Sequence, residues 1–181
     1  MPGGPPTGPG GSVSTAPADP GMLAGVRIPI GAYKIGKEVA RHLLRRPVVG
    51  IVAAARTADG RLLLIRRADS GKWALPGGTL EWGENLRTAI TREVFEETGA
   101  HVSELGALLG VYSAPEHDPR FHAVTVVVAA TIGEPDRTRV NPVEVTELGL
   151  FHDGELPPDS DYSHAMADVV KSVVSKTVVW E

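Results

Sequence analysis

The segment that most constrains the fold is LPGGTLEWGENLRTAITREVFEETGA, residues 75–100, in which a Pro-Gly-Gly turn leads into a helix-forming stretch. On a helix over residues 85–98, Glu97 lies about 40° to one side of Glu93 and Glu96 about 60° to the other. The same side carries three apolar residues, Leu86, Ala89 and Ile90. The three carboxylates therefore extend the face on which the helix is expected to pack.

Local electrostatics oppose this placement of carboxylates. Like charges three and four positions apart on a helix repel by roughly a few tenths of a kcal/mol per pair. Glu96 and Glu97 also lie in the last turn, at the negative end of the helix dipole and before the expected C-terminal Gly99. A bound divalent cation would offset these terms, since Mg²⁺ prefers oxygen ligands. An ordinary solvated face balanced by Arg87 and Arg92 explains the same residues, and helix geometry alone leaves both interpretations open.

The spacing of the segment resembles the full signature of the Nudix hydrolase family, G-x5-E-x7-R-E-U-x-E-E-x-G-U. Every fixed position agrees, namely Gly78, Glu84, Arg92, Glu93, Glu96, Glu97 and Gly99. Val94 takes the first aliphatic position, and Ala100 takes the second, where a larger residue is commoner. The resemblance extends over roughly residues 48–160, including WALPGG before the signature and VTELGLFHDGELP near the end.

This resemblance implies an α/β fold, a Nudix-type α/β/α sandwich around a mixed β-sheet, with a catalytic loop-helix-loop at residues 77–100. It also implies hydrolysis of a nucleoside diphosphate linked to another moiety, with Mg²⁺ or Mn²⁺ as cofactor. Carried over to this sequence, the metal ligands would be the Gly77 carbonyl and the side chains of Glu93, Glu96 and Glu97. Arg92 would orient the glutamates by ion pairing, and Glu84 would brace the loop-helix-loop.

The general base in this family often lies outside the signature, on a loop or strand that faces the metal. We expect Glu147 in this role, because VTELGLF occupies the place where relatives carry a glutamate before the final strand. The alternatives are Glu144, Glu116 and His117. For each of these residues, a solvated surface charge is the competing interpretation.

The stretch GVYSAPEHDPRFHAVTVVV bears on the substrate. Pro115 stands fifteen residues after Ala100, close to the proline that tends to mark ADP-ribose pyrophosphatases in this superfamily. The resemblance therefore favours ADP-ribose or another nucleoside-diphosphate sugar. Arg120 and His122 are expected to contact a phosphate or ribose, and Trp82 to stack on a base. A plain hairpin loop and plain indole packing are the alternatives for these residues.

Two other functions remain open. One is a mutator-type nucleoside triphosphate pyrophosphohydrolase that removes 8-oxo-dGTP or other dNTPs. The other is a non-catalytic Nudix domain that senses a nucleotide. The intact set of glutamates argues against the sensor, because a pure binding domain gains nothing from carboxylates that repel one another.

Composition divides the chain into three parts. Twelve of the first 21 residues are Pro or Gly, so we expect residues 1–21 to form a disordered tail. Residues 22–47 are expected to form an N-terminal helical extension, in which YKIGKEVARHLLR has apolar residues at helical spacing and Pro47 ends the helix. Residues 48–181 are expected to form the Nudix hydrolase domain.

Short apolar runs within residues 48–181 predict strands. VVGIVAAART and RLLLIRR flank an ADG turn, and further strands are expected at WAL, ELGALLGVYSA, FHAVTVVVAATI and VTELGLFHD. The run 123–132 is nearly continuous and apolar, which predicts a buried central strand. YSHAMADVVKSVVSK predicts a closing helix. Strands with helices on both sides indicate layers around a mixed sheet.

Composition also limits the partners. With 18 basic and 22 acidic residues the net charge is −4, which argues against a nucleic-acid-binding surface and favours a small-molecule nucleotide as partner. A homodimer is a further possibility. The longest apolar run, PVVGIVAAA, falls far short of the ~20 residues of a membrane helix, so no membrane partner is expected. The absence of cysteine fits a cytoplasmic location.

Overall fold

The computed structural model describes residues 46–118 and 120–181 and, before them, only residues 1, 3, 4, 22, 23, 26, 27, 34–36 and 39. The chain divides into two compact units, Met1–Arg45 and Arg46–Glu181. In the first unit, β1 (Met22–Leu23) and β2 (Val26–Arg27) pair antiparallel. The expected tail and most of the expected helical extension lie outside the described residues, although residues 34–36 and 39 are helical.

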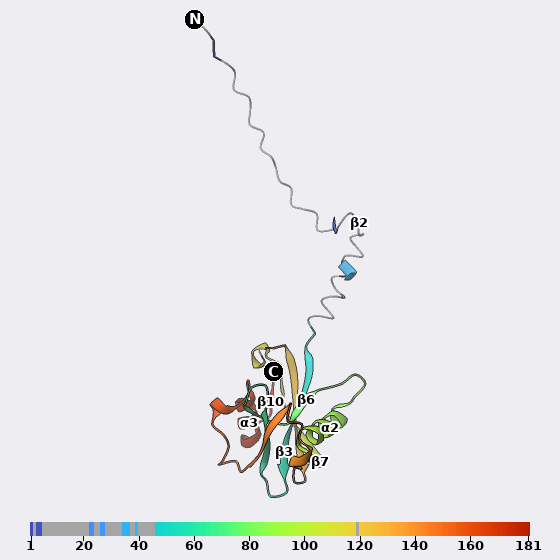
Figure 1. Ribbon diagram of the computed structural model, residues 1–181, viewed down its shortest axis with the longest axis vertical. Coiled ribbons are helices and arrows are strands. Elements are labelled where there is room, and N and C mark those ends of the chain that lie inside the picture. Colours follow the sequence, from blue (N-terminus) through green and yellow to red (C-terminus); the bar gives the residue numbers. More distant parts are fainter. Residues whose placement is uncertain are drawn as a thin grey trace. The chain divides into compact units, whose positions relative to one another are not determined.

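The described part of the second unit holds one mixed sheet of eight strands (Figure 1). Its main order is β10-β7-β8-β3-β4-β5, and β6 pairs with β3 while β9 pairs with β4. The pairs β3–β8 and β7–β10 are parallel, and the others are antiparallel. The strands are β3 (Val48–Thr57), β4 (Leu62–Arg67), β5 (Trp73–Ala74), β6 (Gly77–Thr79), β7 (Val102–Tyr112), β8 (Ala123–Ile132), β9 (Val145–Phe151) and β10 (Val179–Trp180).

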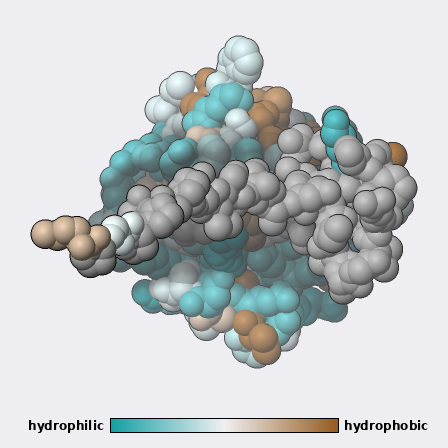
Figure 2. All heavy atoms as spheres, turned by 90° about the horizontal axis from the view of Figure 1, so that it is seen from above, coloured by the Kyte–Doolittle hydropathy of each residue, from teal (hydrophilic) through white to brown (hydrophobic). Residues whose placement is uncertain are grey.

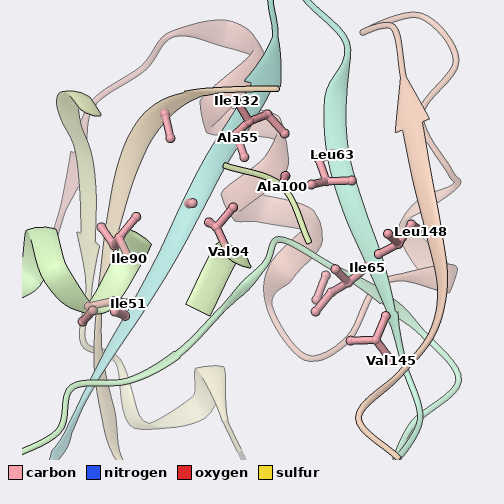
Figure 3. Close-up of a cluster of buried hydrophobic side chains, with 14 residues drawn as sticks. Ile51, Ala55, Leu63, Ile65, Ile90, Val94, Ala100, Ile132, Val145 and Leu148 are labelled. Atoms are coloured by element: carbon pink, nitrogen blue, oxygen red, sulfur yellow. The ribbon is translucent and has the colours of Figure 1, made fainter. Parts of the chain in front are cut away.

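Two α-helices among the described residues cover opposite faces of this sheet, α2 (Leu86–Thr98) and α3 (Met166–Ser175) (Figure 1). Strand residues alternate between the faces. On β3, Ile51 and Ala53 belong to the apolar cluster that includes Ile90 and Val94 of α2, whereas Val52 and Ala54 belong to the cluster that includes residues of α3. Figure 3 shows Ile90 and Val94 beside the side chains of β3 and β4. The expected α/β/α sandwich is confirmed.

The expected strands and the closing helix are also found. β3 and β4 form the expected hairpin, and the closing helix buries Val169, Val170 and Val173. Strand β8 lies inside the sheet as expected, with its residues in register with those of β3 from Val48–Ala123 to Thr57–Ile132. Its expected full burial is not found, because only Val127, Ala130 and Ile132 are buried and most of the others are partly exposed.

Three short 3₁₀ turns complete the second unit, η1 (Pro115–His117), η2 (Arg137–Arg139) and η3 (Asp159–Asp161). On the face of the molecule shown in Figure 2, hydrophobic residues form small patches among hydrophilic ones. Within the described residues, no helix has the length and apolar character needed to cross a membrane.

Candidate active site

The position of α2 is fixed by a cap at each end. The side chain of Asn85 accepts a hydrogen bond from the Thr88 N–H at 3.0 Å, which satisfies one of the free donors of the first turn. Gly99 ends the helix in the left-handed conformation, with φ of 67°, and its N–H donates to the Phe95 carbonyl at 2.8 Å. The helix expected at 85–98 is therefore confirmed, and its last turn carries the acidic residues.

The Pro-Gly-Gly turn brings strand β6 against this last turn. A Cβ atom on Gly78 would lie 2.3 Å from Oε1 of Glu93, and one on Gly77 would lie 2.1 Å from the Ile51 carbonyl oxygen. At Gly77 the close atoms belong to the backbone of β3, so only glycine fits there, whereas at Gly78 a side chain would displace the Glu93 carboxylate. The consequence is that the Gly77 N–H donates to Oε2 of Glu97 at 2.7 Å.

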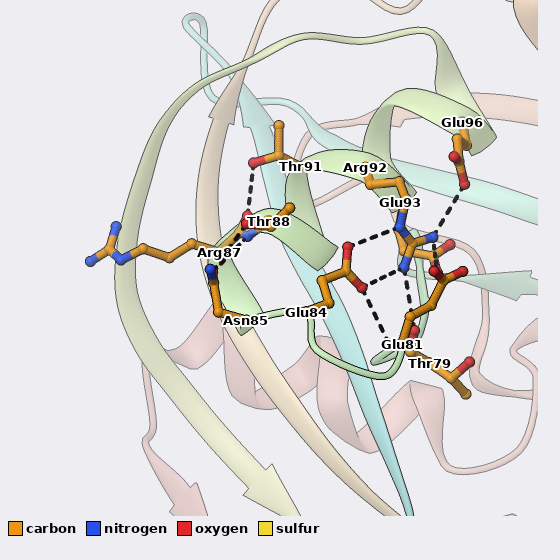
Figure 4. Close-up of polar contacts among 10 residues, drawn as sticks. All are labelled: Thr79, Glu81, Glu84, Asn85, Arg87, Thr88, Thr91, Arg92, Glu93 and Glu96. Carbon is orange, nitrogen blue, oxygen red and sulfur yellow. Dashed lines mark hydrogen bonds and ion pairs between the residues drawn. The ribbon is translucent and has the colours of Figure 1, made fainter.

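Arg92 lies at the centre of a network of carboxylates (Figure 4). Its guanidinium donates to both oxygens of Glu84, at 3.0 and 2.9 Å, to Glu93 at 2.8 Å and to Glu96 at 3.2 Å. Glu84, eight residues earlier, is thereby tied to the helix. These hydrogen bonds, those to Glu84 above all, raise the pKa of Arg92, and they also lower the pKa of Glu84. The network holds the loop before α2 against the helix.

Glu97 is the most unusual charge of the site, because its side chain is 8% exposed and contacts no arginine in the network. Burial raises its pKa to about 8, against the hydrogen bond from Gly77, and the charge of Glu93 acts in the same direction as burial. Burial also raises the pKa of Glu93, although Arg92 opposes this effect. Two neighbouring carboxylates thus lie where their charged forms are disfavoured.

These donors fit a hard divalent cation. Carboxylate and carbonyl oxygens are the ligands that Mg²⁺ and Mn²⁺ take, and a cation beside Glu93 and Glu97 would reverse the electrostatic cost of their burial. Within the described residues, no three acidic or histidine side chains are already gathered as ligands. Instead, Glu93 and Glu96 contact Arg92, and Glu97 contacts Gly77.

A cleft of about 580 Å³ borders this end of α2. Its lining includes Gly77, Glu93, Glu96 and Glu97 on one wall. Residues of strands β3, β7 and β8 and of helix α3 form part of the rest. The remaining lining comes from loops and includes Asp69, Asp118, Arg120, Glu144, Ser163 and His164. The volume falls in the range of sites for small ligands.

The structure divides the four candidates for the general base. Glu144 and His117 line the cleft, but Glu147 and Glu116 are not among its lining residues. Glu147 lies on β9, where its carboxylate contacts Arg66 at 3.2 Å. Glu144 is close enough to Glu97 for its charge to raise the pKa of Glu97 further.

The three candidates for substrate contacts also separate. Arg120 lines the cleft, whereas His122 and Trp82 are not among its lining residues. The His122 ring contacts the Ser113 carbonyl through Nε2 at 2.8 Å, and Trp82 is fully exposed in the loop before α2. Trp73, the other tryptophan near the turn, is buried and packs edge-on against Phe151.

Sequence reasoning did not identify many of the residues that line the cleft, among them Asp69, Asp118, Ser163 and His164. Asp118 contacts Arg120 through both carboxylate oxygens, at 3.0 and 2.8 Å, and Asp69 contacts the same guanidinium at 3.2 Å. His164 has a φ of 49°, which is uncommon for a residue with a side chain. A single sequence carries no signal for these residues, because three separate segments supply them.

Comparison with known proteins identifies the family. A family model described as the NUDIX domain matches residues 44–171. The chain belongs to the Nudix family. The ADP-ribose pyrophosphatase of Methanocaldococcus jannaschii is 46% identical over 72 residues, which are 38% of this chain and 42% of that protein. A MutT-like protein of Streptomyces ambofaciens is 53% identical over 64 residues, which are 35% of this chain and 41% of that protein.

The chain thus spans about two fifths of the length of these curated relatives. A solved structure is similar over more of the Nudix domain. The MutT NUDIX hydrolase of Burkholderia pseudomallei is 34% identical, covers 71% of this chain and 99% of its own, and has a TM-score of 0.60. The Nudix signature and the fold therefore agree, and five of the seven fixed signature residues line the cleft, namely Gly78, Arg92, Glu93, Glu96 and Glu97.

Proposed function

We propose that this Nudix domain hydrolyses the pyrophosphate bond of a nucleoside diphosphate linked to another moiety. The observation that supports this most directly is the buried carboxylate of Glu97, which lies beside Glu93 at the wall of a cleft. Such a pair is costly unless a cation binds it. The intact pair also argues against a domain that only senses nucleotides.

In this proposal Glu93, Glu96 and Glu97, with the Gly77 carbonyl, hold Mg²⁺ or Mn²⁺. When bound, the metal neutralises the pyrophosphate and lowers the pKa of a water. The protein's own contribution is orientation. Arg92 orients Glu93 and Glu96 by donating a hydrogen bond to each. Glu84 in turn orients Arg92, because its two carboxylate oxygens accept hydrogen bonds from the guanidinium.

For the general base we favour Glu144, one of the two alternatives that line the cleft, over Glu147. Glu144 is exposed, which suits a group that takes a proton from a water in the cleft. Its charge acts on Glu97, so it lies near the proposed metal ligands. Glu147 is engaged with Arg66 on β9.

For the substrate we favour ADP-ribose or another nucleoside-diphosphate sugar. The loop of Pro115 supplies four residues to the cleft, His117, Asp118, Arg120 and Phe121. An ADP-ribose pyrophosphatase is also among the curated relatives of this chain. The second candidate is a mutator-type nucleoside triphosphate pyrophosphohydrolase, which the similarity to MutT proteins favours. We further infer a cytoplasmic location, and a homodimer stays a prediction.

A nucleotide screen tests the proposal. The full chain is incubated with ADP-ribose, a nucleoside-diphosphate sugar, dGTP and 8-oxo-dGTP, with Mg²⁺, with Mn²⁺ and with EDTA, and the products are separated. We expect AMP and ribose 5-phosphate from ADP-ribose, and no reaction in EDTA. A tenfold or greater preference for a triphosphate, about 1.4 kcal/mol in transition-state binding, would replace the first candidate with the second.

A further inference from the structure

Every arginine among the described residues that line the cleft is already paired with a carboxylate. Arg92 contacts the glutamates of the signature. Arg67 contacts both oxygens of Asp69, at 3.0 and 2.8 Å. Arg120 contacts Asp118 and Asp69. Arg67, Asp69, Asp118 and Arg120 form the wall of the cleft away from α2, which we call the loop wall. Its two guanidinium groups are balanced by its two carboxylates, so these four residues carry no surplus positive charge.

The loop wall connects two loops that are distant in the sequence. Asp69 lies in the turn between β4 and β5, and Asp118 and Arg120 lie in the loop between β7 and β8. The contact between Asp69 and Arg120 connects them across 51 positions. Hydrogen bonds from Arg67 lower the pKa of Asp69, and those from Arg120 lower the pKa of Asp118. Both carboxylates are therefore ionised at neutral pH.

A wall with this composition treats two kinds of substrate differently. The terminal phosphate of a nucleoside triphosphate carries close to two negative charges. At this wall it would be repelled by the carboxylates and would find no unpaired guanidinium among these four residues to bind it. A sugar attached to the diphosphate is neutral there, and its hydroxyls are donors that ionised carboxylates accept. The same electrostatics thus disfavour a third phosphate and favour hydroxyl groups.

Ser163 is an independent sign that a polar group binds in this cleft. It lines the cleft, its side chain is 3% exposed, and its hydroxyl has no hydrogen-bond partner among the described residues. Its backbone N–H donates to the Trp73 carbonyl at 2.8 Å, which fixes the residue in place. A buried hydroxyl without a partner is costly, and a ligand hydroxyl would satisfy it.

We propose that Asp69, Asp118 and Ser163 determine the substrate class, by selecting a neutral, hydroxyl-bearing group on the second phosphate and rejecting a third phosphate. This inference rests on the proposed function of the cleft. Asp69 and Asp118 act through charge, and Ser163 acts through its hydroxyl. The group that fits this description best is a sugar, as in ADP-ribose.

The test compares kcat/KM for ADP-ribose and for dGTP in the full-length wild-type protein and in two full-length variants, Asp69→Asn and Asp118→Asn. Each variant removes one negative charge and keeps an oxygen that accepts hydrogen bonds. We expect the ratio of kcat/KM for dGTP to kcat/KM for ADP-ribose to rise about tenfold in each variant. The matched control is Asp59→Asn, because Asp59 contacts Arg61 but lies outside the residues that line the cleft, so its ratio should not change.

Ser163→Ala provides a second measurement that involves no charge. We expect kcat/KM to fall several-fold for ADP-ribose and to stay constant for dGTP. An unchanged ratio in both aspartate variants, with melting temperatures like that of the wild type, would overturn the inference. A wild-type preference for dGTP would overturn the proposed function, yet the response of the ratio to Asp69→Asn would still decide whether the wall opposes a third phosphate.

Discussion

The two walls of the cleft are built in opposite ways. The helix wall takes Gly77, Arg92, Glu93 and Glu97 from one segment, and their hydrogen bonds to one another and to Glu84 stay within that segment. The loop wall takes its charged residues from the end of β4 and from two loops that the fold brings together, as in the contact between Asp69 and Arg120. One wall is therefore specified by spacing along the chain, and the other by topology.

The walls also differ in charge. The helix wall carries more carboxylates than its single arginine can neutralise, and one of them, Glu97, is buried. The loop wall is balanced, with Arg67 and Arg120 against Asp69 and Asp118. An excess of carboxylate calls for a metal, whereas a balanced wall favours neutral polar groups. In our proposal, the first wall therefore carries out the chemistry and the second selects the substrate.

The largest effect is expected at the helix wall, in Glu97→Gln. The amide oxygen can still accept the Gly77 N–H, but the charge that the metal requires is lost. We expect kcat to fall by roughly 1,000-fold at saturating Mg²⁺, and Glu96→Gln to act in the same direction. Glu104→Gln, an exposed change on β7, is the matched control. Near-normal turnover of Glu97→Gln would contradict its assignment as a metal ligand.

The same variant makes a prediction about stability. Because burial raises the pKa of Glu97 to about 8, its charge destabilises the metal-free fold at higher pH, and the amide removes that cost. The metal-free melting temperature should therefore not fall. In the wild type, Mg²⁺ at 100 times its Kd should stabilise the fold by about 2.7 kcal/mol, and EDTA should abolish the effect.

The next effect in size separates the two candidate bases. Glu144→Gln should lower kcat by about 100-fold, because the carboxylate that lines the cleft no longer accepts a proton. Glu147→Gln should lose only its contact with Arg66, an exposed pair worth at most about 1 kcal/mol in stability. A pH–rate profile that loses its acidic limb in Glu147→Gln instead would restore the interpretation drawn from the sequence.

A smaller loss of activity is expected when Arg92, which orients the glutamates, is replaced and the glutamates themselves are kept. In Arg92→Lys, one ammonium replaces a fork that contacts Glu84, Glu93 and Glu96 at once. We expect activity to fall by 10- to 100-fold, the usual range for residues that orient metal ligands. Arg87→Lys, on the exposed side of the same helix, is the control. Full activity of Arg92→Lys would show that the Arg92 guanidinium is not needed to orient the glutamates.

These differences explain which features could be predicted from the sequence. The helix wall could be predicted because its residues lie within one turn-helix segment, where spacing determines geometry. Glu144 and Glu147 could not be separated, because the register between β4 and β9 shifts between Arg66 and Arg67. No periodicity reveals such a shift, which changes the side of the strand a residue faces. Ser163 could not be found because its importance depends on burial.

The smallest effect is expected at the loop wall, in Arg120→Lys. Lysine cannot contact both oxygens of Asp118 and also reach Asp69, so the two loops lose their connection. We expect kcat/KM for ADP-ribose to fall about fivefold, roughly 1 kcal/mol, with a smaller change for dGTP. Arg61→Lys is the control, because Arg61 also contacts two carboxylates, Asp59 and Glu134, outside the cleft lining. An equal loss for both substrates would mean that Arg120 stabilises the loop and takes no part in selecting the substrate.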